Sequence, residues 1–116
     1  MSPSIAAGPA STSLRVSIVT TTVADPAQAQ QIAQALVQDR LAACVQIEPI
    51  TSVYRWAGAV HQDAEQRLVC KTSPQALPRL LQALQARHPY EVPQVLVREE
   101  EATAAYAAWV VEETGG

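Results

Sequence analysis

The spacing of apolar residues changes from that of a strand to that of a helix within the first third of the chain. Residues 14–21, LRVSIVTT, are rich in β-branched residues and partly alternate, which predicts a strand. Asp25 followed by Pro26 is typical of a helix N-cap with proline at the first helical position. From 26 to about 40, five apolar residues form one stripe at helical spacing: Ala29, Ile32, Ala33, Leu36 and Val37. We therefore expect a strand followed by an amphipathic helix.

The middle of the chain predicts a long hairpin. Residues 42–55 return to extended character, and Pro49 within them indicates either an edge position or a bulge, because proline cannot donate to a sheet ladder. Ala57 and Gly58 predict a turn. Residues 59–72 then form a third extended segment that would pair with the second.

A leucine-rich segment predicts a second helix. Its leucines fall at the spacing i, i+3, i+4 and i+7: Leu77, Leu80, Leu81 and Leu84. Ser73-Pro74 resembles a helix start, but Pro78 fits only a first turn, so the regular helix should begin later than Pro74. Pro89 disfavours a helical backbone at the preceding residue, which ends the helix near Arg87.

The order of elements predicts an α+β fold. QVLVRE, residues 94–99, reads as a short fourth strand, and residues 103–113 as a terminal helix with Tyr106, Trp109 and Val110 on one face. Strand, helix, strand, strand, helix, strand is the ferredoxin-like split βαβ sandwich, here with a C-terminal helix added. The strands are apolar on both sides, so the sheet face without helices also needs cover. We expect self-association into a homo-oligomer.

Length and charge restrict the class of protein. With 116 residues, of which 48% are apolar, the chain is long enough for one domain, which we place at 14–116 after a flexible tail at 1–13. Eight basic and eleven acidic residues give a net charge of −3, without the basic cluster that nucleic acids require. No segment has the basic start of a signal peptide or the length of a membrane span. We expect a cytoplasmic protein without nucleic-acid or membrane partners.

The two cysteines lie inside strand-like apolar runs. Cys44 and Cys70 are 26 residues apart, a spacing that matches no zinc motif, and a cytoplasmic thiol is normally reduced. Both can be read as small buried residues, or as metal or redox ligands. Enzyme motifs are also missing: the chain has no glycine-rich phosphate loop, nucleophile elbow or HExxH. We expect no catalytic activity and no organic cofactor.

The HPYEVP sequence at residues 88–93 sets a histidine, a tyrosine and a glutamate between prolines, after a predicted helix. His88 follows a predicted helix, where it can meet helix carbonyls as a structural residue. As a metal ligand it needs partners, and Cys44 offers a thiolate while Glu65 or Glu91 offers carboxylate oxygens. Thiolate with imidazole suits copper or zinc better than calcium or magnesium. No two of these residues have a local ligand spacing, so the fold or several subunits must bring them together.

Four runs of residues resemble the CutA divalent-cation tolerance proteins. They stand in the family's order: LAACVQI at 41–47, SVYRWAG at 52–58, the stretch from Glu65 to Lys71-Thr72, and HPYEVP. The resemblance covers about residues 14–112. It implies a ferredoxin-like fold, a compact homotrimer, an architecture like that of the PII signalling proteins, and binding of copper(II) or another divalent cation.

The resemblance also implies site residues. The family's positions match Cys44, Trp56, Glu65, Lys71, His88 and Tyr90. Two positions depart from the family pattern: Gln94 replaces an acid after the second proline, and the acidic REEEATAA replaces a leucine-proline turn.

The remaining candidates each have two readings. Lys71 either meets an anion or the Tyr90 region, or forms a solvated or intersubunit salt bridge. It cannot pair with Glu65, because six residues along one strand span about 20 Å. Trp56 either caps the core or anchors a neighbouring subunit. Glu99, Glu100 and Glu101 read as a solvated acidic turn, or as a weak cation site.

Together with the residues, the resemblance to the CutA family implies a cytoplasmic homotrimer that binds a divalent metal of the copper type. The predicted ligands are His88, Cys44 and Glu65, and the predicted residues lining the cleft are Tyr90, Lys71, Trp56 and Glu91. The alternative is a PII-like signalling or small-molecule-binding trimeric scaffold without a dedicated metal site. A Lys-His-Tyr cluster would also permit acid-base chemistry, but no substrate is indicated.

Overall fold

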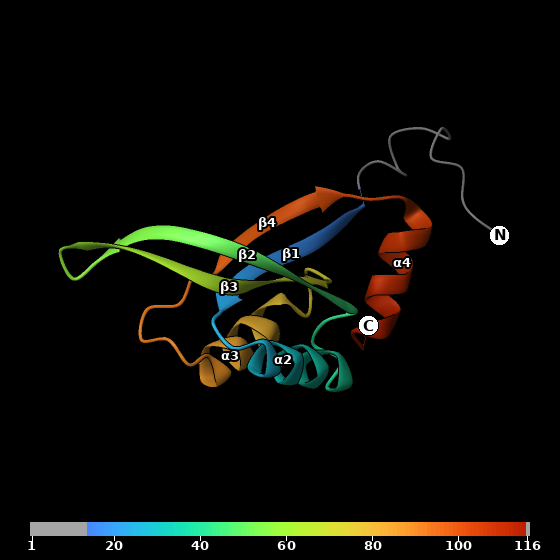
Figure 1. Cartoon of the computed structure of the whole chain (residues 1–116). Helices are drawn as coiled ribbons and strands as arrows, with labels where there is room; N and C mark the ends of the chain where they lie inside the picture. Colours follow the sequence, from blue (N-terminus) through green and yellow to red (C-terminus); the bar gives the residue numbers. More distant parts are fainter. Residues whose placement is uncertain (1–13, 116) are drawn as a thin grey trace.

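The computed structural model describes residues 14–115, so the tail predicted at 1–13 lies outside the described residues. Three helices and four strands follow each other in the predicted order (Figure 1). They are β1 (Arg15–Val23), α2 (Pro26–Gln38), β2 (Cys44–Trp56), β3 (Ala59–Thr72), α3 (Leu77–Arg87), β4 (Leu96–Glu101) and α4 (Ala104–Glu113). The predicted order of elements is therefore confirmed.

A side chain caps α2, and a turn closed by a serine precedes α3. The Asp25 carboxylate accepts a hydrogen bond of 2.9 Å from the amide of Ala27, which makes it the predicted N-cap of α2. The Ser73 hydroxyl accepts one of 3.1 Å from the amide of Ala76, one residue before α3 begins at Leu77. A turn thus occupies the first residues after Ser73, and the regular helix begins later than Pro74, as predicted.

The sheet has the strand order β2-β3-β1-β4, with all neighbours antiparallel. This is the order of the split βαβ arrangement, and it confirms the ferredoxin-like α+β prediction. The β2–β3 ladder runs without interruption from Cys44 opposite Lys71 to Trp56 opposite Ala59. Pro49 therefore lies on an edge strand without a bulge, which decides between the two readings of that residue.

Two hydrophobic clusters lie on the two faces of β1. Val19 and Val23 are buried under α2 and α3, together with residues such as Leu36, Leu68 and Leu80. Val16 and Ile18 point to the opposite face and pack against Ala107 and Val110 of α4. Figure 1 shows α2 and α3 on one face of the sheet and α4 at its end. The terminal helix therefore covers part of the second face.

Two arginines from other parts of the domain donate hydrogen bonds to the C-terminal end of α4. Arg40, which has a positive φ of 59°, donates to the main-chain carbonyls of Glu112 and Glu113. Arg79 donates to the carbonyl of Thr114 at 3.3 Å. Cations near the C-terminal carbonyls are favourable for a helix. These contacts hold the helix that covers the second cluster.

The acidic run is a strand and not the predicted turn. Glu99 and Glu101 pair with Ser17 and Arg15 in the β1–β4 ladder, which continues two residues beyond the predicted strand end. β4 is an edge strand with exposed side chains, where charged residues are well tolerated and discourage further pairing. Arg15 lies 3.7 Å from Glu101 and partly offsets its charge.

The β2–β3 hairpin extends beyond the other strands. The last residue of β1, Val23, pairs with Gln66, which lies opposite Pro49. Residues 50–65 therefore form the part of the hairpin that projects from the body (Figure 1). Several large apolar side chains on it are exposed, with Val53 at 65%, Trp56 at 51% and Val60 at 63%. Among residues 14–115, no helix is both long and apolar enough to cross a membrane.

Candidate functional site

A cleft of about 940 Å³ lies where the projecting hairpin, the end of β1 and the segment 88–94 meet. A volume of this size suits a small molecule or an ion with its water shell. Its lining includes three aromatic residues and three carboxylates: Tyr54, Trp56, Tyr90, Asp63, Glu65 and Glu91. Four of the residues predicted for the site thus meet here, namely Trp56, Glu65, Tyr90 and Glu91.

His88 lies behind this cleft, at the C-cap of α3. Its Nε2 atom lies 2.9 Å from the Thr21 hydroxyl and 3.1 Å from the Thr22 carbonyl oxygen. Its Nδ1 atom accepts a hydrogen bond of 3.1 Å from the amide of Tyr90. Both ring nitrogens therefore have partners within the chain. Burial lowers the pKa of His88, while the Thr22 carbonyl and the charge of Glu65 oppose that shift.

Tyr90 connects the segment 88–94 to β3. Its hydroxyl donates a hydrogen bond of 2.7 Å to Glu65 Oε2. Burial first, and then the hydrogen bond to the Glu65 carboxylate, raise the pKa of Tyr90. The phenol therefore stays protonated and remains a donor. Glu65 lines the cleft, and a carboxylate that accepts one hydrogen bond can still accept others.

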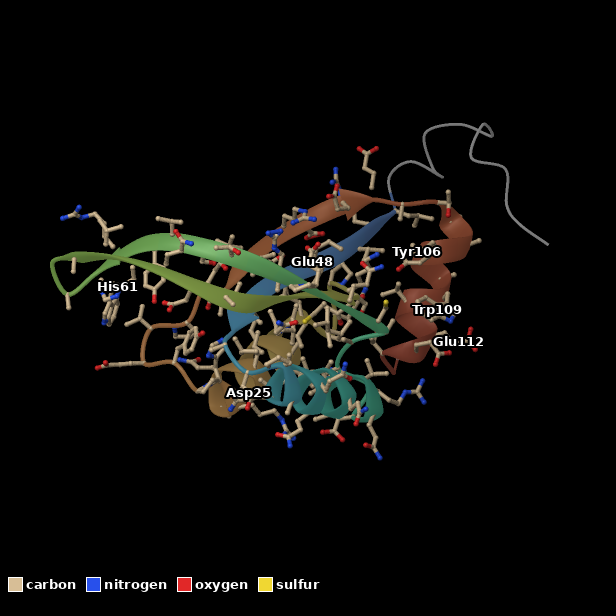
Figure 2. All side chains as sticks on the ribbon, in the orientation of Figure 1. Asp25, Glu48, His61, Tyr106, Trp109 and Glu112 are labelled. Atoms are coloured by element: carbon tan, nitrogen blue, oxygen red, sulfur yellow. The ribbon has the colours of Figure 1, made fainter. Side chains whose placement is uncertain are left out.

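A second tyrosine–carboxylate pair lies on the hairpin. The Tyr54 hydroxyl donates a hydrogen bond of 2.5 Å to Asp63 Oδ2, which raises the pKa of Tyr54. The His61 ring stacks on Tyr54 with 5.5 Å between centroids, and Figure 2 shows His61 on the hairpin. Sequence reasoning missed Tyr54 and Asp63. Counting outward from the Ala57-Gly58 turn places them on one face of the ladder, so the signal was present.

The cleft is acidic. Asp63, Glu65 and Glu91 line it, and its lining contains no lysine, arginine or histidine. The carboxylates are nevertheless spread out: within residues 14–115, no three His, Cys, Asp or Glu side chains are grouped so as to hold one metal ion. The arrangement attracts cations, but one chain alone does not provide a closed metal cage.

Cys44 and Lys71 lie away from the cleft. They pair with each other at the start of β2, whereas Glu65 pairs with Ile50. Six residues of strand separate the two positions, which corresponds to about 20 Å. The Lys71 ammonium is 5.9 Å from the ring centroid of Tyr106, a residue of α4 in Figure 2. One chain therefore does not bring together the predicted ligands His88, Cys44 and Glu65, and its Lys71 contacts α4 instead of lining the cleft.

The two thiols have different environments. Cys70 is fully buried in the main cluster, and burial raises the pKa of its thiol to about 12. Cys44 is half-buried, and both cysteines are free. Cys70 thus behaves as a small buried residue, which is one of the two readings of the sequence.

Fold and relatives together define the class of protein. The fold is similar to that of a PII-like protein, the CutA protein from Nostoc sp. PCC 7120 in apo form. The TM-score is 0.81 at 36% identity, over 84% of this chain and 96% of that one. The model of the CutA1 divalent ion tolerance protein family matches residues 17–113. The chain belongs to the CutA1 family.

Two further relatives show how much of the chain the family covers. The divalent-cation tolerance protein CutA of Thermus thermophilus is 44% identical over 100 residues, which are 84% of this chain and 97% of the relative. The structure of CutA from Synechococcus elongatus PCC7942 has a TM-score of 0.85 at 40% identity, over 89% of this chain and 93% of that one. The same protein is also described in complex with a Bis-Tris molecule, with a TM-score of 0.80 over 87% of this chain and 95% of that one.

Proposed function

We propose that the chain forms a homotrimer that binds a divalent cation in the acidic cleft, with copper(II) as the first candidate. The observation that carries this proposal is the lining of the cleft, which contains Asp63, Glu65 and Glu91 but no lysine, arginine or histidine. Such a lining concentrates cations and disfavours anions. The divalent-cation tolerance named in the family description is consistent with this choice of ligand.

Glu65 is the ligand that the geometry favours most. Its carboxylate is held by Tyr90 and faces the cleft, and Asp63 and Glu91 supply further oxygen atoms. The set predicted from sequence requires more than one subunit, because Cys44 lies about 20 Å from Glu65 along the hairpin. It also requires His88 to give up a hydrogen bond. A neighbouring subunit is therefore the source we propose for any softer ligand.

The exposed hairpin supports the homotrimer. Val53, Trp56 and Val60 expose large apolar surfaces on the segment that projects from the body. The ladder register places Val53 and Val60 on one face of the hairpin and Trp56 on the other. Large apolar side chains exposed on both faces of a projecting hairpin are typical of an interface. We therefore favour the second reading of Trp56, an anchor in a neighbouring subunit, and a cleft completed by that neighbour.

A titration calorimetry experiment tests the metal proposal. Copper(II) and zinc(II) are titrated into the metal-free trimer, into Glu65→Gln and into Glu112→Gln. The glutamine in place of Glu65 still accepts the Tyr90 hydrogen bond but loses the charge. Glu112 on α4 lies outside the cleft and is the matched control. We expect at least about tenfold weaker binding for Glu65→Gln alone; equal affinity in all three proteins would refute the assignment.

A second candidate function is binding of a small organic cation by a PII-like scaffold. Trp56, Tyr54 and Tyr90 line the same cleft as the carboxylates, and aromatic faces with nearby carboxylates suit an alkylammonium group. A relative described in complex with Bis-Tris supports a small-molecule site in this family. Separate titrations of 1,6-diaminohexane and of hexane-1,6-diol into EDTA-treated protein distinguish the two functions. Binding of an organic cation requires that the diamine bind without metal and that the uncharged diol not bind.

The cytoplasmic location is part of the proposal. Both cysteines are free, and Cys44 is only half-buried. A partly exposed free thiol fits a reducing compartment. Cell fractionation of the untagged protein tests it, and recovery with the membrane or exported fraction would contradict it. We propose no catalytic role.

A further inference from the structure

His88 joins three separate parts of the chain. It ends α3, it reaches the end of β1 through Thr21 and Thr22, and it holds the amide of Tyr90. The segment 88–95 has neither helix nor strand, so side chains must fix its position. The rings of His88 and Tyr90 also contact each other, with 5.0 Å between centroids.

The partners define the state of the ring. The Thr22 carbonyl can only accept, so Nε2 carries the hydrogen atom in this contact. The Tyr90 amide can only donate, so Nδ1 presents its lone pair. This is the neutral imidazole with the hydrogen on Nε2. Neither nitrogen has a lone pair left for a cation.

The contacts continue from His88 into the cleft. The Tyr90 amide is fixed by the His88 ring, and the Tyr90 hydroxyl holds Glu65 Oε2 at 2.7 Å. Displacing the ring would free the Tyr90 backbone and, with it, the hydroxyl that orients Glu65. Residues that orient ligands in this way affect affinity without touching the bound ion.

We infer that His88 is a positioning residue, which sets Tyr90 and through it Glu65, and is not itself a ligand of the bound cation. The inference rests on the proposed function for its effect on affinity. The part that concerns Tyr90 does not depend on any cation.

Two substitutions separate positioning from ligation. The shorter side chain in His88→Asn places an amide oxygen near the position of the histidine Nδ1 atom, where it can accept the Tyr90 amide hydrogen bond. His88→Ala removes both contacts. Positioning predicts that copper(II) affinity falls by about tenfold or more in His88→Ala, and that His88→Asn recovers most of it. Ligation by the imidazole predicts an equal loss in both variants.

A double-mutant cycle with Tyr90→Phe adds a second readout. If His88 acts through Tyr90, the variant His88→Ala/Tyr90→Phe binds copper(II) no more weakly than His88→Ala alone. Additive losses would overturn the inference. Electron paramagnetic resonance of the copper(II) complex gives a direct check. We expect the same nitrogen couplings in wild type and in His88→Ala. An imidazole nitrogen coupling that is present in wild type and lost in His88→Ala would make His88 a ligand.

A metal-free measurement keeps the inference separate from the proposed function. Hydrogen exchange of the Tyr90 amide, followed by NMR in EDTA, should accelerate in His88→Ala and stay slow in His88→Asn. Unchanged exchange in His88→Ala would overturn the positioning role, whether or not a cation binds. If the wild-type protein binds no cation, the proposed function is refuted. The positioning role is still supported if Tyr90 amide exchange is faster in His88→Ala and slow in wild type and His88→Asn. Circular dichroism checks that each variant is folded.

Discussion

The hydroxyl of Tyr90 and the carboxylate of Glu65 lie 2.7 Å apart, although 25 residues separate them in the chain. This contact ties the segment 88–94 to the projecting hairpin. It is formed between a phenol that stays protonated and a carboxylate that faces the cleft. Two residues with different sequence contexts thus become one unit of the candidate site.

Removing this hydroxyl should weaken the domain slightly. In Tyr90→Phe, a partly buried hydrogen bond to a carboxylate is lost, and we expect the free energy of unfolding to fall by about 1 kcal/mol. Urea unfolding at a fixed subunit concentration measures it, since oligomers depend on concentration. Tyr106→Phe on α4 is the control. Equal midpoints for wild type and Tyr90→Phe would show that the contact contributes nothing to stability.

The pH dependence of stability should carry the signature of His88. Burial lowers its pKa below the ordinary value of 6.5. The unfolded chain therefore takes up a proton more readily than the folded one as pH falls below 6.5. The stability from the neutral ring is complete above that pH and is lost as pH falls from there toward the folded-state pKa.

The comparison of wild type with His88→Asn isolates this effect from the carboxylates. The difference between their free energies of unfolding should shrink between about pH 7.5 and pH 5. Urea unfolding at several pH values measures it. A difference that stays constant over this range would mean that His88 takes up protons equally in both states.

The two cysteines should differ in reactivity. Burial raises the pKa of Cys70 to about 12, and its side chain has no exposed surface, whereas Cys44 is half-buried. Because the thiolate is the reactive form, iodoacetamide at about pH 8 should modify Cys44 at least about tenfold faster. Peptide mass spectrometry measures both rates, and in urea they should become similar. Faster labelling of Cys70 in the folded protein would contradict the assigned core position.

Trp56 should be important for assembly. Its side chain is 51% exposed on the hairpin, and we expect Trp56→Ala to shift the mass measured by sedimentation velocity from trimer toward monomer at micromolar concentration. Val37→Ala, at a 42% exposed position on α2, is the control. A trimer that survives Trp56→Ala unchanged would remove the hairpin ring from the proposed interface.

Much of the fold could be predicted because its signals are local. The Ala57-Gly58 turn has positive φ angles of 53° and 80°, and its position fixes the register of the whole hairpin. Asp25 marks the start of α2 through a contact two residues away. The acidic run was misread because a strand at the sheet edge tolerates charge that an inner strand would exclude.

The site was less accessible to sequence reasoning because its contacts are distant. His88 contacts Thr21, which is 67 residues away in the chain. Its Nδ1 atom accepts a hydrogen bond from the main-chain amide of Tyr90, and a main-chain partner cannot be inferred from a pattern of side chains. In the β2–β3 ladder, Cys44 lies opposite Lys71, whereas Glu65 lies opposite Ile50. The thiolate of Cys44 and the carboxylate of Glu65, which the sequence predicted as ligands of one metal, are therefore far apart in one chain. Trp56, Glu65, Tyr90 and Glu91 do share the cleft.

The central claim is that the acidic cleft holds a divalent cation through Glu65. Anomalous diffraction from crystals of the protein soaked with zinc(II) or copper(II) tests it most directly. We predict a peak in the cleft of each subunit at a coordination distance of about 2.0–2.2 Å from a Glu65 oxygen atom, and no such peak in Glu65→Gln. Peaks found only beside Cys44, or an empty cleft at saturating metal, would contradict the account.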